Sequence, residues 1–450
     1  MENKLEKKYG LITAIAMVVG IVIGSGVFFK AEKVLTATGG NLSLGILAWV
    51  IGGIIMISCA YSFAVMATKY ERVNGVVDYA QATMGKKYAY YIGWFMALIY
   101  YPTLTSVLAW VAARYTCVLI GFSITGGECM TIAGLYLIAS FALNALSPIL
   151  AGKFQVSTTV IKLIPLLLMA IVGTIVGIYS GMTVRNFTTV TENISTTTAL
   201  FTAVVATAFA YEGWIIATSI NAELKDAKRN LPIALVVGTF VIMIVYILYY
   251  VGLAGAVPNE VMMKGGETGA RLAFETVFSS IGGSLVFVFV IISCLGTLNG
   301  LMLGCTRGIY SIAARGEGIK PEMFNQIDKV TNMPTNSAVF GLLLSGIWLF
   351  FFYGANLADK WFGFLCFDSS ELPIVTLYAM YIPIFIMMIK KEKDLNIFNR
   401  VIAPSVAIIG CIFMIVAACF SHKMAVISYL VVFVVIMILG AFFIKREKSI

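Results

Sequence analysis

Long runs of hydrophobic residues, separated by short polar segments, dominate this chain. Runs of about 20 residues, the length at which a helix crosses roughly 30 Å of hydrocarbon, recur about twelve times. This pattern predicts an all-α polytopic membrane protein. The expected spans lie near residues 11–37, 42–68, 88–121, 130–150, 155–180, 197–219, 231–256, 272–314, 337–354, 362–389, 401–420 and 424–444.

The first and the sixth of these runs are interrupted near their middle. Ile-Gly-Ser-Gly-Val-Phe occupies 23–28, and Phe-Ala-Tyr-Glu-Gly-Trp occupies 209–214. Non-helical backbone at membrane depth is tolerated only where it is buried in protein or lines a water-filled cavity. Two such breaks at corresponding places in a repeated chain indicate a transporter's binding site. Glycines that let helices cross closely are the alternative explanation of the first break.

The positions of the two breaks predict an inverted repeat. If the broken spans are the first and sixth, two units of five helices are followed by two extra helices. Because five is odd, the second unit enters the membrane from the opposite side. We expect a cytoplasmic tail at 1–9, a first repeat at 10–182, a second repeat at 195–390, helices eleven and twelve at 398–445, and a cytoplasmic tail at 446–450.

Composition and charge support this class of protein. The 450 residues are 60% hydrophobic and 12% charged, which leaves too few polar side chains to cover a soluble globule. The net charge of +9 comes from lysines and arginines in short loops between spans. That distribution orients a membrane protein rather than binding nucleic acid, and it predicts both termini on the cytoplasmic side of the cell membrane.

Cysteine and histidine usage indicates no catalytic or metal chemistry. The eight cysteines lie mostly within spans and show no CxxC spacing, which is typical of apolar packing. Cys129, at the outer start of the fourth span, is better placed to react, and the single histidine, His422, is expected in a short external loop. No nucleophile and base pair at a plausible depth can be named. We therefore expect no enzyme, cofactor or metal.

The residues of the two breaks suit a zwitterion. At Ile23, Gly24, Ser25 and Gly26 the glycines expose backbone amides, and the following half-helix directs its N-terminus at the break, so an anionic carboxylate is expected there. The second break holds Phe209, Ala210, Glu212 and Gly213. Its free carbonyls accept hydrogen bonds from an ammonium group, and its aromatic residues close over a small ligand. Glu212 serves either in proton coupling or in capping and pairing with a neighbouring helix.

Other polar side chains lie inside the spans. Lys162, about seven residues into span five, is a functional candidate by its depth, with snorkelling as the alternative. Thr297 and Asn299 in span eight either face the pathway or make interhelical hydrogen bonds. Asp368 and Glu371, at the start of span ten, share a helix face if that stretch is helical. They are candidates for the outer pathway, a proton site or a cation site, and a solvated entrance to the span is the alternative.

Four motifs in order resemble the amino acid, polyamine and organocation transporter superfamily, and within it the L-amino acid transporter family with its bacterial serine/threonine exchangers. They are Gly24-Ser-Gly-Val-Phe28, Phe209-Ala-Tyr-Glu-Gly-Trp214, the segment Asn221–Pro232 after span six, and Cys294–Gly300 with Arg307, Arg315 and Gly316. Lys162 adds to the resemblance, which covers nearly the entire chain.

The resemblance implies the LeuT-type fold and sodium-independent exchange of amino acids. It places carboxylate binding on Gly24, Ser25 and Gly26, and ammonium binding on the carbonyls of Phe209, Ala210 and Glu212. Phe209 also matches the family's aromatic gate, and Lys162 stands in the space of the sodium site. Animal members pair with a glycoprotein through an outer cysteine. Cys129 lies near that place but matches poorly, so no obligatory protein partner is predicted.

We therefore expect a sodium-independent exchanger of neutral L-amino acids that works by alternating access. Span ten departs from the family, because Asp368 and Glu371 occupy places that usually hold aromatic or aliphatic residues. That departure keeps a proton-coupled importer of cationic amino acids or polyamines as one alternative. A membrane sensor that binds an amino acid without transporting it is a second alternative.

Overall fold

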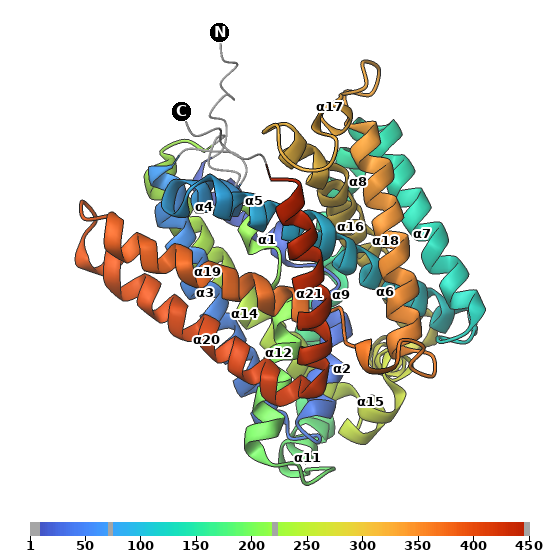
Figure 1. Cartoon of the computed structure of the whole chain (residues 1–450). Coiled ribbons are helices and arrows are strands. Elements are labelled where there is room, and N and C mark those ends of the chain that lie inside the picture. Colours follow the sequence, from blue (N-terminus) through green and yellow to red (C-terminus); the bar gives the residue numbers. More distant parts are fainter. Residues whose placement is uncertain (1–9, 71–74, 218–223, 445–450) are drawn as a thin grey trace, which may run out of the picture. The chain divides into compact units, whose positions relative to one another are not determined.

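The computed structural model describes residues 10–70, 75–217 and 224–444, and within these ranges the chain is helical without any strand (Figure 1). The expected tails 1–9 and 446–450, and the motif residues Asn221–Glu223, lie outside the described residues. Contacts divide the chain into two compact units. The first combines 1–84, 160–290 and 374–421, and the second combines 85–159, 291–373 and 422–450.

The first unit holds both interrupted runs. Its helices are α1 Leu11–Val22, α2 Gly26–Ala37, α3 Leu42–Lys69, α4 Val76–Met84, α9 Leu163–Leu168, the π-helical turn Met169–Gly173, α10 Thr174–Ser180, α11 Met182–Thr188, α12 Thr196–Tyr211, α13 Trp214–Ala217, α14 Ala227–Ala256 and α15 Asn259–Gly265. Most of α19 Leu372–Lys391 and α20 Ala403–His422 also belongs to it, with the π-helical turn Phe398–Ile402 before α20.

The second unit is built from the remaining long helices. These are α5 Lys86–Phe95, the π-helical turn Met96–Tyr100, α6 Tyr101–Ile120, α7 Gly127–Leu146, most of α8 Pro148–Ile161, α17 Pro321–Phe324, α18 Thr335–Asn356, the 3₁₀ turn Gly363–Leu365 and α21 Met424–Phe442. The long helix α16 Glu267–Ala313 runs through both units and is interrupted at Ser279, where φ is 66°.

The spans match the hydrophobic runs of the sequence. Within the described ranges, ten helical stretches are long and apolar enough to cross a membrane, and they coincide with ten of the twelve expected runs. The other two runs, 11–37 and 197–219, contain the shorter apolar helices Leu11–Gly20 and Thr196–Tyr211. These are the two runs that the sequence predicts to be interrupted.

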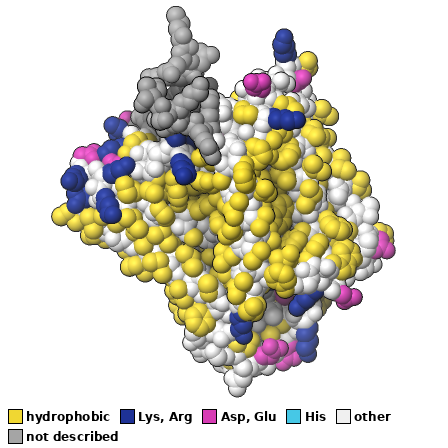
Figure 2. Space-filling view, viewed as in Figure 1, with side chains coloured by type: hydrophobic (Ala, Val, Ile, Leu, Met, Phe, Trp, Pro, Cys, Tyr) yellow, Lys and Arg dark blue, Asp and Glu magenta, His cyan; other side chains and the backbone are white. Residues whose placement is uncertain are grey.

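Hydrophobic side chains cover the flanks of the helices, whereas charged side chains gather toward their ends (Figure 2). On α21, for example, Val434, Val435 and Ile438 are exposed. Large apolar side chains in that position would aggregate in water but suit contact with lipid. The chain is therefore a multi-pass membrane protein.

In the first unit, α14 packs beside α1 and α3, and α12 packs beside α2 and α3 (Figure 1). Close crossings are made with glycine. A Cβ atom on Gly252 of α14 would lie 2.1 Å from the carbonyl oxygen of Met169. The α14 backbone therefore approaches its neighbour more closely than any larger residue permits.

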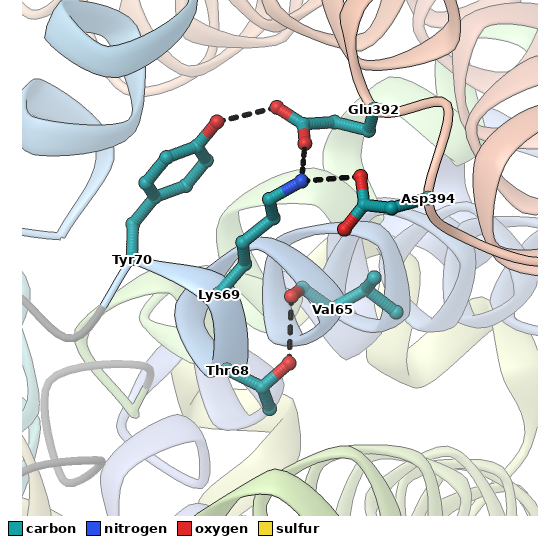
Figure 3. A network of polar contacts seen from close by, with 6 residues as sticks. All are labelled: Val65, Thr68, Lys69, Tyr70, Glu392 and Asp394. Carbon is teal, nitrogen blue, oxygen red and sulfur yellow. Dashed lines mark hydrogen bonds and ion pairs between the residues drawn. The ribbon is translucent and has the colours of Figure 1, made fainter.

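A polar network joins the end of α3 to the segment that follows α19 (Figure 3). Lys69 Nζ pairs with the buried carboxylate of Glu392 and lies 2.6 Å from Asp394 Oδ1, while the Tyr70 hydroxyl donates to Glu392. The hydrogen bond from Lys69 holds the pKa of Asp394 below its usual value. Burial, followed by the hydrogen bond to Glu392, raises the pKa of Tyr70 to about 12.

Glu392→Gln is expected to destabilise this junction more than Asp394→Asn. Glu392 is buried and accepts from two donors, and losing a hydrogen bond to a charged group costs roughly 1.5–3 kcal/mol. Asp394 is largely exposed, so solvent screens its ion pair. Because the pKa of Asp394 is lowered, its contribution is present above the ordinary aspartate pKa and is lost as the pH falls through the lowered value. Apparent melting temperatures of both variants in detergent test this ranking, and equal shifts would contradict it.

Candidate functional site

The first interruption is a short, buried, non-helical segment. Helix α1 ends at Val22, Ile23 is extended with φ −64° and ψ 109°, and α2 begins at Gly26. All residues from Ile23 to Gly26 are buried. The N–H groups in the first turn of a helix have no partner within that helix, so the start of α2 can receive an anion.

The second interruption lies at the end of α12. Glu212 is extended with φ −69° and ψ 156°, Gly213 has φ 107°, and α13 begins at Trp214. That φ lies in the region that favours glycine, which explains Gly213 here. Phe209 and Ala210 are buried, and Glu212 and Gly213 are half-buried. The last carbonyls of a helix also lack partners within it, so the end of α12 can receive a cation.

The structure brings the two interruptions together. A Cβ atom on Gly26 would lie 2.6 Å from the Cα atom of Ala210 and 3.0 Å from the carbonyl oxygen of Phe209. Only glycine permits this approach of α2 to α12. The predicted residues of both breaks therefore form one neighbourhood in the first unit, although more than 180 residues separate them in the sequence.

Tyr246 of α14 ties the two breaks to each other. Its buried hydroxyl lies 3.1 Å from the carbonyl oxygen of Ala210 and 3.4 Å from that of Val22, and it donates to both. Its ring stacks on Tyr211 at 5.3 Å, and the Tyr211 hydroxyl donates to the carbonyl of Trp49 at 2.8 Å. An aromatic cluster from α3, α12 and α14 thus holds the ends of α1 and α12 in place.

Tyr246→Phe is expected to lower the apparent melting temperature of the purified protein. The substitution keeps the ring and removes the hydroxyl from two helix-end carbonyls, and one such hydrogen bond contributes about 1 kcal/mol. Tyr179→Phe, at an exposed tyrosine of α10, is the matched control and should change nothing. If Tyr246→Phe and the wild type have the same melting temperature, the Tyr246 hydroxyl does not hold the two breaks together.

Lys162 reaches the first break from span five. It lies between α8 and α9 and is buried, and its Nζ donates to the carbonyl of Gly20 in the last turn of α1. A cation at the C-terminal end of a helix is stabilised by the helix dipole. The fifth span begins at Pro148, whereas the sequence predicts a start near residue 155. Lys162 therefore lies deeper in this span than predicted. Its buried contact excludes snorkelling to the surface.

Thr297 and Asn299 lie on α16 in the second unit. The Asn299 side chain accepts from Asn144 at 2.9 Å and donates to Gln155 at 3.2 Å. The Thr297 hydroxyl donates to the Ser293 carbonyl of its own helix. Of the two readings of Asn299, hydrogen bonding between helices is therefore the one that the contacts favour.

The tenth span begins later than predicted, so the stretch that contains Asp368 and Glu371 is not helical and the two residues share no helix face. Helix α19 begins at Leu372, so both residues precede it in a non-helical segment. Asp368 accepts from the Ser370 amide at 2.7 Å, which shapes a local turn. The ring of His422 lies 3.0 Å from Glu371. His422 is the last residue of α20 and not part of a loop, which corrects a second expectation.

The expectation that Cys129 is placed to react was also wrong. It is fully buried at the start of α7, and its thiol hydrogen-bonds with that of Cys117. Among the described residues, no group of three or more His, Cys, Asp and Glu side chains is arranged to hold a metal ion.

The sequence reasoning missed Lys30, Trp49 and Tyr246. Lys30 lies four residues beyond Gly26 and is fully buried, with its ammonium 5.1 Å from the centre of the Phe209 ring. A lysine inside the first hydrophobic run was a visible signal, because an ionisable residue at such a depth is unusual. Nothing in the sequence pointed to Trp49 and Tyr246, since they reach the breaks only through folding.

Comparison with known proteins decides the family. A family model described as amino acid permease matches residues 9–443. The chain belongs to the amino acid permease family. This family lies within the amino acid, polyamine and organocation superfamily, so the resemblance read from the four motifs is confirmed.

Several curated relatives of this permease cover most of its length. It is 28% identical over 384 residues to the serine/threonine exchanger SteT of Bacillus subtilis. This alignment covers 85% of the permease and 83% of the relative. It is 24% identical over 441 residues to the human b(0,+)-type amino acid transporter 1, with 96% and 86% covered. The human cystine/glutamate transporter is 24% identical over 354 residues, with 77% and 68% covered.

Proposed function

We propose that this permease is a sodium-independent exchanger of neutral L-amino acids that works by alternating access. The observation that carries the proposal is the direct contact of Gly26 with Ala210, because it sets the start of one half-helix against the end of another. Relatives named as a serine/threonine exchanger and as amino acid transporters support the same class of substrate.

The two helix ends supply opposite partial charges to one ligand. The substrate carboxylate binds the amides of Gly24, Ser25 and Gly26 at the positive start of α2. Its ammonium group binds the carbonyls of Phe209, Ala210 and Glu212 at the negative end of α12. The Ala210 carbonyl already accepts from Tyr246, but a carbonyl oxygen has two lone pairs. These groups replace the water that a zwitterion loses when it enters the membrane.

The fold we propose for transport is the LeuT-type inverted repeat of twelve spans, with repeats at 10–182 and 195–390. Helices α1 and α2 form a discontinuous first span, and α12 and α13 form a discontinuous sixth. The moving bundle consists of spans one, two, six and seven. The mutual packing of α1, α2, α3, α12 and α14 within the first unit supports this bundle.

Lys162 acts in this proposal as a permanent substitute for a transported cation. Its ammonium donates to the Gly20 carbonyl at the end of α1, where a bound sodium ion would otherwise stabilise the helix end. A resident charge makes external sodium unnecessary. We further propose that the protein lies in the cell membrane with both termini in the cytoplasm, and that it needs no obligatory protein partner.

Uptake of a labelled amino acid panel into proteoliposomes tests the substrate class. We expect neutral amino acids to be taken up at equal rates in sodium and choline buffers. Uptake of cationic amino acids or polyamines that grows with an imposed proton gradient would instead establish the importer, and would assign proton coupling to Asp368, Glu371 or Glu212. Amino acid binding without any flux would identify a sensor.

A further inference from the structure

A fully buried lysine stands beside the predicted gate. Lys30 lies in α2, and its ammonium is 5.1 Å from the ring centres of both Phe29 and Phe209. The two rings meet edge to face, with centres 6.0 Å apart. The Lys30 charge of α2 therefore lies over the Phe209 ring of α12.

Burying an ammonium is costly, and aromatic rings are among the contacts that offset that cost. A desolvated charge is retained when it gains compensating contacts or serves a function. Aromatic faces attract cations within about 6 Å of the ring centre, and the attraction grows when water is excluded. The Lys30 ammonium lies within this distance of two rings. Phe29 belongs to the same helix as Lys30, whereas Phe209 belongs to α12.

We propose that Lys30 is a positioning residue that holds the Phe209 ring against α2 and so favours closure of the gate over a bound amino acid. The inference rests on the proposed function, because it takes Phe209 to be the gate. Lys30 acts on the ring through its charge rather than by binding substrate. When the gate opens, the Phe209 ring turns away from Lys30, and the contact between cation and ring is restored at closure.

The test compares exchange by Lys30→Met and Lys30→Arg proteins in proteoliposomes. Methionine has a similar volume without the charge, and arginine keeps a cation that stacks on aromatic rings. We expect Lys30→Met to lower the exchange rate about tenfold, the order of effect of a desolvated cation–π contact, and Lys30→Arg to retain most of the rate. Lys33→Met is the matched control, because Lys33 lies on the same helix and contacts Phe29 but is only half-buried.

A double-mutant cycle with Phe209→Leu isolates the contact. If Lys30 works through the ring, Lys30→Met should cause no further loss of exchange in the Phe209→Leu background. The same cycle is read from apparent melting temperatures, which do not depend on activity. The loss caused by Lys30→Met should also be equal for neutral and acidic amino acids.

Three results would overturn the inference. They are an unchanged rate in Lys30→Met, an equal loss in the presence and absence of the Phe209 ring, and a loss confined to amino acids with an acidic side chain. The last would make Lys30 a direct partner of the substrate. If the wild type itself does not exchange amino acids, the proposed function fails, while the melting-temperature cycle still decides whether Lys30 and Phe209 are coupled.

Discussion

Gly26→Leu is expected to lower amino acid exchange by about 100-fold while leaving insertion into the membrane intact. A Cβ atom at this position would lie 2.6 Å from the Cα atom of Ala210, and the contacting atoms belong to the backbone and cannot rotate away. Overpacking of a tight contact costs roughly 1–3 kcal/mol, which corresponds to a loss of about 5- to 150-fold. The larger value applies here, because the substitution also displaces the start of α2 from the proposed carboxylate site.

Gly346→Leu is the matched control for this variant. Gly346 lies in the membrane-spanning helix α18, and a Cβ atom there would meet nothing within 4 Å. Both variants are measured by labelled amino acid uptake after quantification in the membrane. Normal exchange by correctly inserted Gly26→Leu would show that the contact between the two breaks is not part of the transport site.

Lys162→Met is expected to lower exchange by about 10- to 100-fold. Methionine fills a similar volume but leaves the Gly20 carbonyl at the end of α1 without its ammonium partner. Losing a hydrogen bond to a charged group costs roughly 1.5–3 kcal/mol. The loss should appear in transport, because α1 belongs to the proposed moving bundle and its end lies at the substrate break.

Lys153→Met provides the comparison within the same span. Lys153 lies in α8, within the same span as Lys162, but is exposed, so its removal should leave exchange and melting temperature unchanged. Exchange rates and apparent melting temperatures of the two variants are compared in parallel. If Lys162→Met transports as fast as Lys153→Met, Lys162 neither stabilises the break nor replaces a cation.

The spans could be read from the sequence because each is a long apolar run with polar ends. The interruptions were also visible, since Gly-Ser-Gly and Glu-Gly stand inside two of these runs. The contact of Gly26 with Ala210 and the bridge made by Tyr246 were not, because they depend on how distant helices pack. Local pattern specifies elements, whereas the partners of their side chains come from the tertiary structure.

The late start of the tenth span had a signal in the sequence. Proline is tolerated in the first turn of a helix but removes a hydrogen bond farther inside, so Pro373 marks a helix start close to itself. Helix α19 indeed begins at Leu372, and Asp368 forms the turn before it. The position of His422 had no such signal, because Lys423, with φ 47°, ends α20 at a residue that seldom adopts this conformation.

Counterflow in sodium-free proteoliposomes at equal internal and external pH distinguishes exchange from other modes of transport. Vesicles that contain the wild-type permease are either empty or preloaded with an unlabelled neutral amino acid, and uptake of the labelled amino acid is followed. For an exchanger we expect rapid uptake into preloaded vesicles and little uptake into empty ones. Equal uptake into both would contradict an exchange mechanism.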